Sequence, residues 1–224
     1  MERLADDLWH LAFPLKRLGL DIQRHVTILS LPSGVVVHST APFAPAQVEA
    51  IRGLGEVRWV LDAMLDHDSY AEAGRVAFPE ATFLGPPGFA ERVPFPVDPL
   101  LPPPAEWTGY LEVLPIEGVP SMREHVFLHT PSRTLIVADL ALHFPSPPPV
   151  FRALLSLALK GGRAPGVSRR VEAAIKDRVA FRASVKKMMQ WDFDRLIVGH
   201  GTPLEAGAKS ALETLFGRVG WLDR

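Results

Sequence analysis

The sequence predicts a layered α/β protein, and its length and composition limit the number of domains and the kinds of metal ligand. Two regions rich in β-branched residues are each flanked by segments with helical spacing of apolar residues. The chain has 224 residues, of which 47% are hydrophobic, and can therefore bury one sizeable core. Cysteine is absent, which excludes disulfides, thiolate metal sites and a cysteine nucleophile. We expect a single domain over residues 1–224, in which any metal ion is bound by His, Asp or Glu.

The first half of the chain alternates predicted strands and helices. Pro32-Ser33-Gly34 separates two β-branched runs, which predicts a hairpin. Pro45 stands near the first position of a helical pattern that ends before Gly55, which predicts a short helix. The elements predicted in this half are strands over 25–31, 35–39, 57–61 and 81–84, and helices over 44–54 and 70–78.

The second half begins with a β-rich segment, and most of its predicted helices follow that segment. Ser168 is a natural N-cap for a long helix, because its hydroxyl can accept a hydrogen bond from the first helical turn. Prolines gather at 86–104 and 145–149, which predicts rigid loops able to wall a cleft. The elements predicted here are strands over 110–114, 126–129, 134–138 and 195–198, and helices over 150–159, 169–190 and 206–216.

Balanced charge narrows the classes of partner. The formal net charge is -1, which gives no overall electrostatic reason to expect nucleic acid or an anionic membrane. The first residues are charged, and the apolar stretches are too short for a signal peptide or a membrane span, so we expect a cytoplasmic protein. The expected partners are a small-molecule substrate and, as an option, a second copy in a homodimer.

Polar clusters follow three of the predicted strands. Asp66 and His67 come shortly after strand 57–61, Asp139 follows strand 134–138, and His200 follows strand 195–198 between two glycines. In layered α/β proteins the carboxyl ends of strands meet at the ligand crevice, so we expect these four side chains to share one site. Imidazole and carboxylate ligands without thiolate suit zinc, iron or manganese.

Each cluster also has a purely structural interpretation. Asp139 could cap a turn, and His200 could be an ordinary turn residue between its glycines. Asp66 and His67 could lie in a solvated loop, with Asp68 or Ser69 capping the next helix. Three placements directly after strands favour a common site over three separate coincidences.

At these residues the chain resembles the metallo-β-lactamase superfamily, and within it the DUF4336 branch. The resemblance implies a metallo-β-lactamase-like four-layer αβ/βα sandwich. The segments that carry it are Leu31-Pro32-Ser33-Gly34 with Val37-His38-Ser39, Phe78-Pro79-Glu80-Ala81, Ser132-Arg133-Thr134-Leu135-Ile136-Val137-Ala138-Asp139-Leu140, and Val198-Gly199-His200-Gly201-Thr202-Pro203.

The same resemblance implies that one of two metal positions is lost. The superfamily signature Thr-His-x-His-x-Asp-His aligns its Asp-His with Asp66-His67 and places Asp62 and Met64 where two histidines stand. A further histidine expected before Asp139 has only His125 as a substitute. One divalent ion is therefore implied, zinc first, with iron or manganese as alternatives. The retained ligands are Asp66, His67, Asp139 and His200.

The resemblance implies a metal-dependent hydrolase for a small ester, thioester, lactone or phosphoester. Asp62 is the candidate general base, Asp66 is a second catalytic candidate, and His143 is a candidate supporting residue near Asp139. The alternative is a non-catalytic pseudoenzyme or ligand-binding module, because the first metal position is lost. Iron-dependent redox chemistry is a third interpretation.

A basic segment spans residues 160–187. An anion-binding face is one interpretation, but the balanced overall charge favours a solvated helix surface. The segment holds nine basic residues, Lys160, Arg163, Arg169, Arg170, Lys176, Arg178, Arg182, Lys186 and Lys187, against Glu172 and Asp177.

Overall fold

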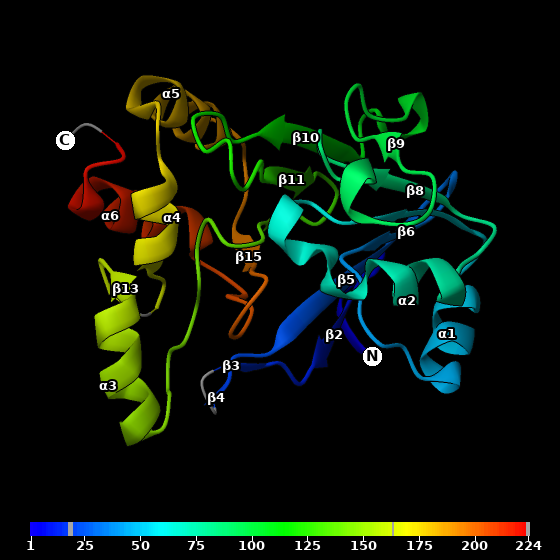
Figure 1. The fold of residues 1–224 in the computed structure, drawn as a ribbon, viewed down its shortest axis with the longest axis horizontal. Helices are drawn as coiled ribbons and strands as arrows, with labels where there is room; N and C mark the ends of the chain where they lie inside the picture. Colours follow the sequence, from blue (N-terminus) through cyan, green and yellow to red (C-terminus); the bar gives the residue numbers. More distant parts are fainter. Residues whose placement is uncertain (18–19, 163, 223–224) are drawn as a thin grey trace.

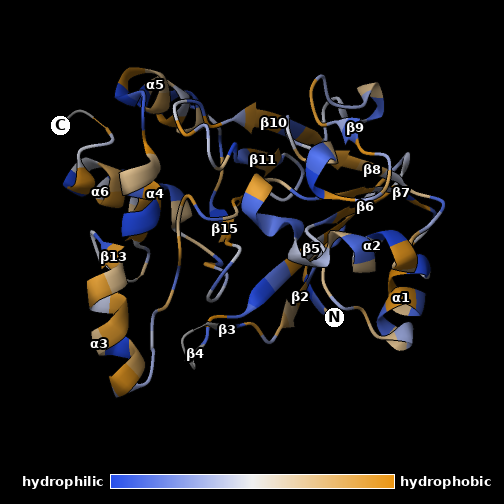
Figure 2. Ribbon diagram, viewed as in Figure 1, coloured by the Kyte–Doolittle hydropathy of each residue, from blue (hydrophilic) through white to orange (hydrophobic). Residues whose placement is uncertain are grey.

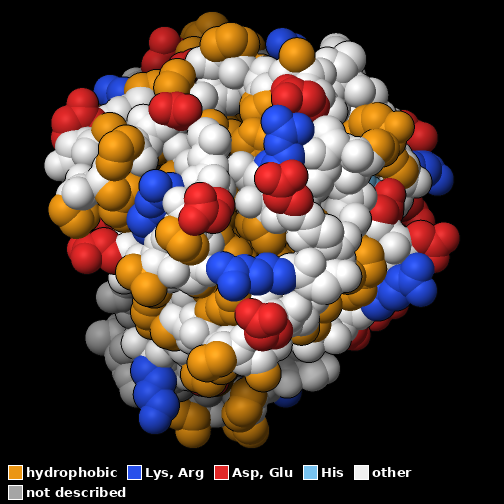
Figure 3. Space-filling model, turned by 90° about the vertical axis from the view of Figure 1, so that its right-hand side faces the viewer, with side chains coloured by type: hydrophobic (Ala, Val, Ile, Leu, Met, Phe, Trp, Pro, Cys, Tyr) orange, Lys and Arg blue, Asp and Glu red, His pale blue; other side chains and the backbone are white. Residues whose placement is uncertain are grey.

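Two β-sheets face each other at the centre of the molecule, and helices cover their outer faces (Figure 1). The computed structural model describes residues 1–17, 20–162 and 164–222. The predicted layered α/β architecture is confirmed. Hydrophobic residues run along strands such as β8 and β10 (Figure 2), whereas the face at the right of Figure 1 carries acidic and basic side chains intermixed (Figure 3).

The first sheet contains the hairpin and the parallel strands predicted from the first half. Its order is β1-β2-β5-β6-β7-β8-β9, in which β5 and β6 pair antiparallel and β6, β7 and β8 pair in parallel. β1 and β2 are not among the predicted strands. The strands are β1 (Glu2–Ala5), β2 (Leu8–Phe13), β5 (Arg24–Leu31), β6 (Gly34–His38), β7 (Val57–Leu61), β8 (Thr82–Gly85) and β9 (Asp98–Pro99).

The second sheet has the order β10-β11-β12-β15, and β12 pairs in parallel with β15, which lies at the edge of the sheet. Because the parallel pair runs in one direction, the residues after β12 and those after β15 emerge at the same edge of the sheet. The strands are β10 (Leu111–Pro115), β11 (His125–His129), β12 (Thr134–Ile136) and β15 (Arg195–Ile197).

Three apolar clusters define four layers. One cluster joins Leu61 of the first sheet to Phe127 and Ile197 of the second, so it fills the space between the sheets. A second packs Ile51 of α1 against the outer face of the first sheet, and a third packs Phe181 of α5 against the outer face of the second. The covering helices are α1 (Pro45–Arg52), α2 (Ala71–Ala77), α4 (Arg169–Ala174), α5 (Arg178–Met188) and α6 (Ala208–Val219).

The prediction of a single helix over 169–190 is wrong, because two helices, α4 and α5, occupy this range. Ser168 caps α4 as expected, but Asp177 starts a new helix by accepting hydrogen bonds from Val179 N and Ala180 N. The carbonyl of Gly118 accepts from Lys176 N and Asp177 N at 2.8 and 3.2 Å, which takes these amides out of a continuous helix.

The remaining elements are short or peripheral. α3 is found close to its predicted range and stands at the edge of the molecule (Figure 1). No helix in the described part of the chain is long and apolar enough to cross a membrane. These elements are α3 (Pro149–Ala158), β3 (Lys16–Arg17), β4 (Leu20–Asp21), β13 (Leu159–Lys160), β14 (Val167–Ser168) and the 3-10 helices η1 (Leu65–Tyr70), η2 (Ala90–Arg92) and η3 (Ala105–Trp107).

Candidate metal centre

Three side chains converge after three different strands. His67 lies in η1 after β7, Asp139 follows β12, and His200 follows β15. One ligand atom from each lies within 4.8 Å of the other two. The Asp139 Oδ1 atom is 3.6 Å from His67 Nε2 and 3.4 Å from His200 Nε2. The fold thus brings together three of the four residues expected to bind a metal ion.

The geometry of this cluster fits an ion better than direct hydrogen bonds. The separations of 3.4 and 3.6 Å exceed ordinary hydrogen-bond lengths. Tetrahedral zinc with Zn–N and Zn–O distances of about 2.0–2.1 Å would hold its ligand atoms about 3.4 Å apart. Asp139 Oδ1 and both ring nitrogens of His67 are among several buried polar atoms of the described residues that have no hydrogen-bond partner. Orphaned polar atoms of this kind call for an ion or water.

His200 is oriented for metal binding by its other nitrogen. Its Nδ1 lies 2.5 Å from the carbonyl oxygen of Gln23, and because that oxygen only accepts, Nδ1 carries the hydrogen. The Nε2 lone pair then faces Asp139. A histidine that donates one ring N–H to a backbone carbonyl and offers the other nitrogen is the usual arrangement at metal sites.

The charge states of the cluster suit a cation. Burial, and after it the Arg24 guanidinium, lowers the pKa of His67 to about 4, so its imidazole is neutral at pH 7. Burial alone would raise the pKa of Asp139, but His67, His200 and Arg170 together hold it below its usual range. A neutral imidazole beside a carboxylate is the protonation state that a metal ion requires.

Asp66, the fourth predicted ligand, lies in the same cavity but outside the cluster. Its carboxylate forms an ion pair with Arg170 of α4. Both residues line a cavity of about 650 Å³ together with His67, Asp139 and His200. Asp66 and Arg170 therefore place a carboxylate and a guanidinium group in the wall of the cavity that holds the cluster.

Asp62 is fully buried and its two oxygens are already engaged. Oδ1 accepts from Arg24 at 2.9 Å and from Thr40 N at 3.1 Å, and Oδ2 accepts from Thr40 Oγ1 at 2.7 Å. Burial raises the pKa of Asp62 to about 6 against the opposing effects of Arg24 and Thr40. Arg24 also donates to the carbonyl oxygen of His67 at 3.1 Å. Asp62 is not among the residues that line the 650 Å³ cavity, so its predicted role as a base stays a prediction.

Glu124 was missed by sequence reasoning, although it holds the loop that carries Asp139. Its carboxylate accepts from Ala138 N at 2.8 Å, from Asp139 N at 3.2 Å and from Leu140 N at 3.2 Å. Burial and the nearby Asp139 carboxylate raise the pKa of Glu124 to about 8. A charged residue directly before a buried strand was the only signal in the sequence.

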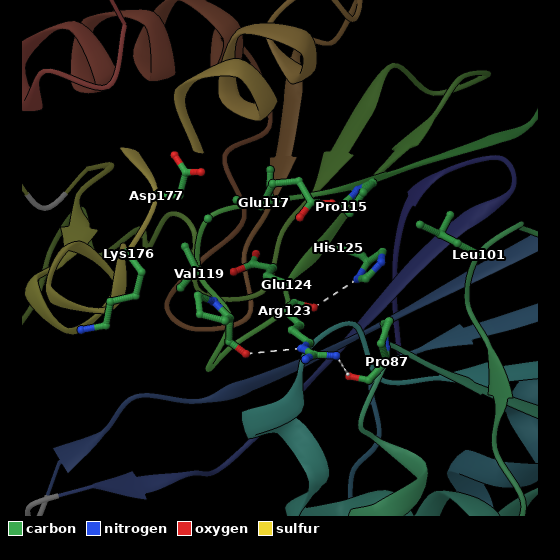
Figure 4. Close-up of a pocket in the computed structure, with 13 residues that line it drawn as sticks. Pro87, Leu101, Pro115, Glu117, Val119, Arg123, Glu124, His125, Lys176 and Asp177 are labelled. Atoms are coloured by element: carbon green, nitrogen blue, oxygen red, sulfur yellow. Dashed lines mark hydrogen bonds between the residues drawn. The ribbon is translucent and has the colours of Figure 1, made fainter. Parts of the chain in front are cut away.

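The two histidines named as supporting or substitute residues lie apart from the cluster. The His125 ring contacts the Arg123 carbonyl through Nδ1 at 3.1 Å and, with Glu124, lines a second cavity of about 420 Å³ (Figure 4). His143 contacts the carbonyl oxygen of Thr202 through Nδ1 at 2.7 Å, and its own carbonyl accepts from Thr202 N at 2.8 Å. His143 thereby braces the loop that follows His200.

Replacing Gly201 with alanine should destabilise the protein by about 1–3 kcal/mol or more. Gly201 has a φ of +105°, and an added Cβ would lie 2.1 Å from the carbonyl oxygen of His143. Gly217→Ala is the matched control, since its added Cβ meets nothing within 4 Å and helix α6 favours alanine. Urea denaturation measures both variants. Equal stability of Gly201→Ala and the wild type would show that the loop tolerates a side chain.

Replacing Glu124 with glutamine should weaken metal binding by about 10- to 100-fold, as loss of a residue that supports a ligand commonly does. One Glu124 oxygen accepts from Ala138 N and Leu140 N and the other from Asp139 N, and glutamine would put an NH2 group, which cannot accept, in one of these two places. Zinc affinity is measured by competition with a chromophoric chelator. Glu117→Gln, an exposed residue of the same 420 Å³ cavity, is the control. Similar zinc affinities of the two variants would show that Glu124 does not support the metal site.

The metal-free protein should lose stability as the pH falls from about 6.5 toward 4. The unfolded chain binds histidine protons near the usual pKa of 6.5, whereas burial lowers the pKa of folded His25 and His67 to about 4. Each such histidine lowers the unfolding free energy by up to about 1.4 kcal/mol for every unit by which the pH falls in this window. The histidines with lowered pKa are His10, His25, His38, His67, His125 and His129.

Two carboxyl groups act in the opposite direction on stability. Burial raises the pKa of Asp62 and of Glu124, so these groups keep a proton in the folded protein at pH values where the unfolded chain has released it. Both groups therefore stabilise the folded protein as the pH falls. Six histidines outnumber them, so urea denaturation should give a lower unfolding free energy at pH 5 than at pH 7. Greater stability at pH 5 would mean that the carboxyl groups dominate.

Comparison with known proteins shows the fold. No family model matches the chain, and no curated protein matches its sequence. A metallo-β-lactamase from Erythrobacter litoralis superposes with a TM-score of 0.68 at 15% identity, over 99% of this chain and 96% of that chain. The chain therefore has the metallo-β-lactamase fold that the sequence resemblance implied.

Two further solved structures differ in the metal named for them. The metallo-β-lactamase FIM-1 from Pseudomonas aeruginosa, solved in a mono-zinc form, superposes with a TM-score of 0.67 at 12% identity over 99% of this chain and 95% of that chain. The Flv1 flavodiiron core from Synechocystis gives a TM-score of 0.64 at 10% identity, over 96% of this chain and 58% of that chain. Sequence identities this low show a shared fold and nothing more.

Proposed function

We propose that this chain is a metal-dependent hydrolase that binds one divalent ion through His67, Asp139 and His200. The observation that carries the proposal is the convergence of three ligand atoms, two of them on orphaned buried groups, at the ends of three strands. Asp66, in the wall of the same cavity, is the fourth ligand or the proton acceptor. Zinc is the ion proposed first, and iron or manganese would use the same donor atoms.

The proposed substrate is a small ester, thioester, lactone or phosphoester. An ion bound here would polarise a carbonyl or phosphoryl oxygen and lower the pKa of a water molecule. The cavity of about 650 Å³ is within the usual range for a small-molecule site. Arg170, when released from Asp66, can donate to an anionic group of the substrate, and Asp66 can then accept a proton.

Each proposed ligand is held by a separate supporting contact. Arg24, itself bound to Asp62, donates to the backbone carbonyl of His67. Glu124 accepts from the backbone of Asp139, and Gln23 accepts from the ring of His200. We propose Asp62 and Glu124 as positioning residues, since both are buried and act through other groups.

The finer family assignment is also a proposal. Placement in the DUF4336 branch is supported by the segments around Asp139 and His200, which carry two of the proposed ligands. A non-catalytic ligand-binding protein is the second candidate. It is favoured by one observation, namely that Asp62 and Asp66, the two carboxylates considered as bases, are both paired with arginines.

A hydrolysis screen tests the proposal. Chelator-treated protein reloaded with zinc is assayed on chromogenic esters, a thioester, a lactone and a phosphodiester, beside the His67→Ala, His200→Ala double variant. We expect turnover of at least one class by the wild type, and its loss both in the variant and after chelation. A zinc-loaded wild type no more active than the double variant on every class would contradict the hydrolase and support the binding protein.

A further inference from the structure

The ion pair between Asp66 and Arg170 connects two walls of the cavity that holds the metal cluster. Both residues line this cavity of about 650 Å³. Asp66 lies in η1, directly before His67, whereas Arg170 lies in α4, which covers the second sheet. Figure 1 shows α4 in yellow and the η1 segment in cyan, in different halves of the molecule. The ion pair therefore ties the two halves of the fold together at the candidate metal centre.

Arg170 reaches this cavity from the basic segment over 160–187. Among the described basic residues of that segment, Arg170 is the one that lines the cavity. Lys160, from the same segment, pairs instead with Glu172. Arg163, also named in this segment, lies outside the described residues. Arg170 is therefore the residue through which the basic segment acts on the candidate metal centre.

Asp66 is held outside the group of residues that could bind an ion. That group consists of His67, Asp139 and His200, whose ligand atoms lie within 4.8 Å of one another. Three ligands leave one position of a tetrahedral ion open, and a carboxylate in the same cavity wall is the natural group to fill it. The Asp66 carboxylate is instead engaged by the guanidinium of Arg170 in a charge-assisted hydrogen bond. Arg170 thus occupies the carboxylate that an ion in the cluster would attract.

The charge of Arg170 also acts on the cluster itself. Although burial raises the pKa of Asp139, that pKa is held below its usual range, first by the ring of His67 and also by the charge of Arg170. A positive charge close enough to stabilise the Asp139 carboxylate also repels a cation that approaches it. Arg170 therefore opposes metal binding in two ways, by pairing with Asp66 and by its charge.

Exposure makes the ion pair easy to break. The side chain of Arg170 is 66% exposed and that of Asp66 is 21% exposed, whereas the Asp139 and His200 side chains are 14% and 12% exposed. Exposed ion pairs contribute little to stability, because water and salt compete for both charges. An ion that gains a carboxylate ligand can therefore displace Arg170 into solvent without unfolding the protein.

We propose that Arg170 is a latch on the metal centre, which competes with the bound ion for the Asp66 carboxylate and is released when the ion binds. The inference rests on the proposed function, because it requires the ion that His67, Asp139 and His200 are proposed to bind. Release of the latch leaves the guanidinium free at the cavity wall, where it can donate to an anionic group of a substrate. The metal-free protein keeps this guanidinium paired with Asp66.

Zinc affinity tests the latch, measured on metal-free protein by competition with a chromophoric chelator. We expect Arg170→Gln to bind zinc about 3- to 10-fold more tightly than the wild type, because Asp66 is no longer paired and a nearby positive charge is removed. The matched control is Arg169→Gln, which changes the neighbouring exposed arginine of α4, a residue that is not among those lining the cavity. Its zinc affinity should stay within about 2-fold of the wild type.

A double-mutant cycle with Asp66→Asn separates competition for the carboxylate from the effect of charge alone. In the Asp66→Asn protein, adding Arg170→Gln should raise zinc affinity by about 2-fold at most, because no carboxylate is left for Arg170 to hold. Equal gains in both backgrounds would assign the effect to charge alone and overturn the latch.

Two further outcomes distinguish failure of the latch from failure of the metal centre. A wild type that binds zinc while Arg170→Gln binds it no more tightly than Arg169→Gln would overturn the latch and leave the metal centre standing. A folded wild type and a folded Arg170→Gln that both fail to bind zinc would overturn the metal centre, and the latch with it. Circular dichroism establishes that each variant is folded.

Discussion

Replacing His67 and His200 together with alanine is expected to abolish stoichiometric binding of a divalent ion while the fold is retained. The change leaves Asp139 as the remaining member of the cluster. The loss of affinity should exceed the roughly 10- to 100-fold effect of removing a residue that only supports a ligand. Zinc titration of the metal-free proteins by calorimetry measures it.

A histidine pair elsewhere provides the control for this experiment. His10 and His129 are buried but lie outside the cluster, so their joint replacement by glutamine should leave zinc affinity within a few-fold of the wild type. Thermal unfolding shows whether each variant is folded. Unchanged affinity in the His67→Ala, His200→Ala variant would mean that these residues do not bind the ion.

The second large effect is expected on stability. Asp62→Ala should lower the unfolding free energy by about 3–5 kcal/mol, because it leaves the guanidinium of Arg24 buried without its partner. Asp62 also holds Arg24, which donates to the carbonyl oxygen of His67. Zinc affinity should therefore fall as well in Asp62→Ala. Urea denaturation of the metal-free protein separates the first effect from the second.

A double replacement distinguishes an unpaired charge from poor packing. Arg24→Met combined with Asp62→Leu removes both charges and should recover most of the stability lost in Asp62→Ala. A double variant as unstable as Asp62→Ala would assign the loss to packing. An Asp62→Ala protein within about 1 kcal/mol of the wild type would contradict the buried ion pair altogether, since breaking such pairs is strongly destabilising.

Most of the fold could be predicted from local patterns, because the central strands are continuous apolar runs between clear turns. β5 and β6 are an example, with Pro32-Ser33-Gly34 marking their hairpin. β1 could not be predicted, since Glu2-Arg3-Leu4-Ala5 has no β-branched residue and is a strand only through its pairing with β2. The break between α4 and α5 depends on Gly118, about 60 residues away in the sequence, and helical periodicity does not reveal such a contact.

The candidate site was predictable to the extent that it follows strand ends. His67, Asp139 and His200 each stand just beyond a buried strand, and the fold brings them together. The supporting contacts were not predictable. Glu124 acts on backbone amides 14 to 16 residues later, and Arg170 pairs with Asp66 over 104 residues of sequence. Such contacts depend on how separate layers pack, and no local pattern encodes them.

The metal content of the protein tests the central claim most directly. Protein purified without a metal-affinity tag is analysed by inductively coupled plasma mass spectrometry, before and after chelation and reloading. We predict close to one equivalent of zinc, iron or manganese per chain, held by the cluster of His67, Asp139 and His200. A folded wild-type protein that contains no metal and regains none on incubation with these ions would contradict the metal centre.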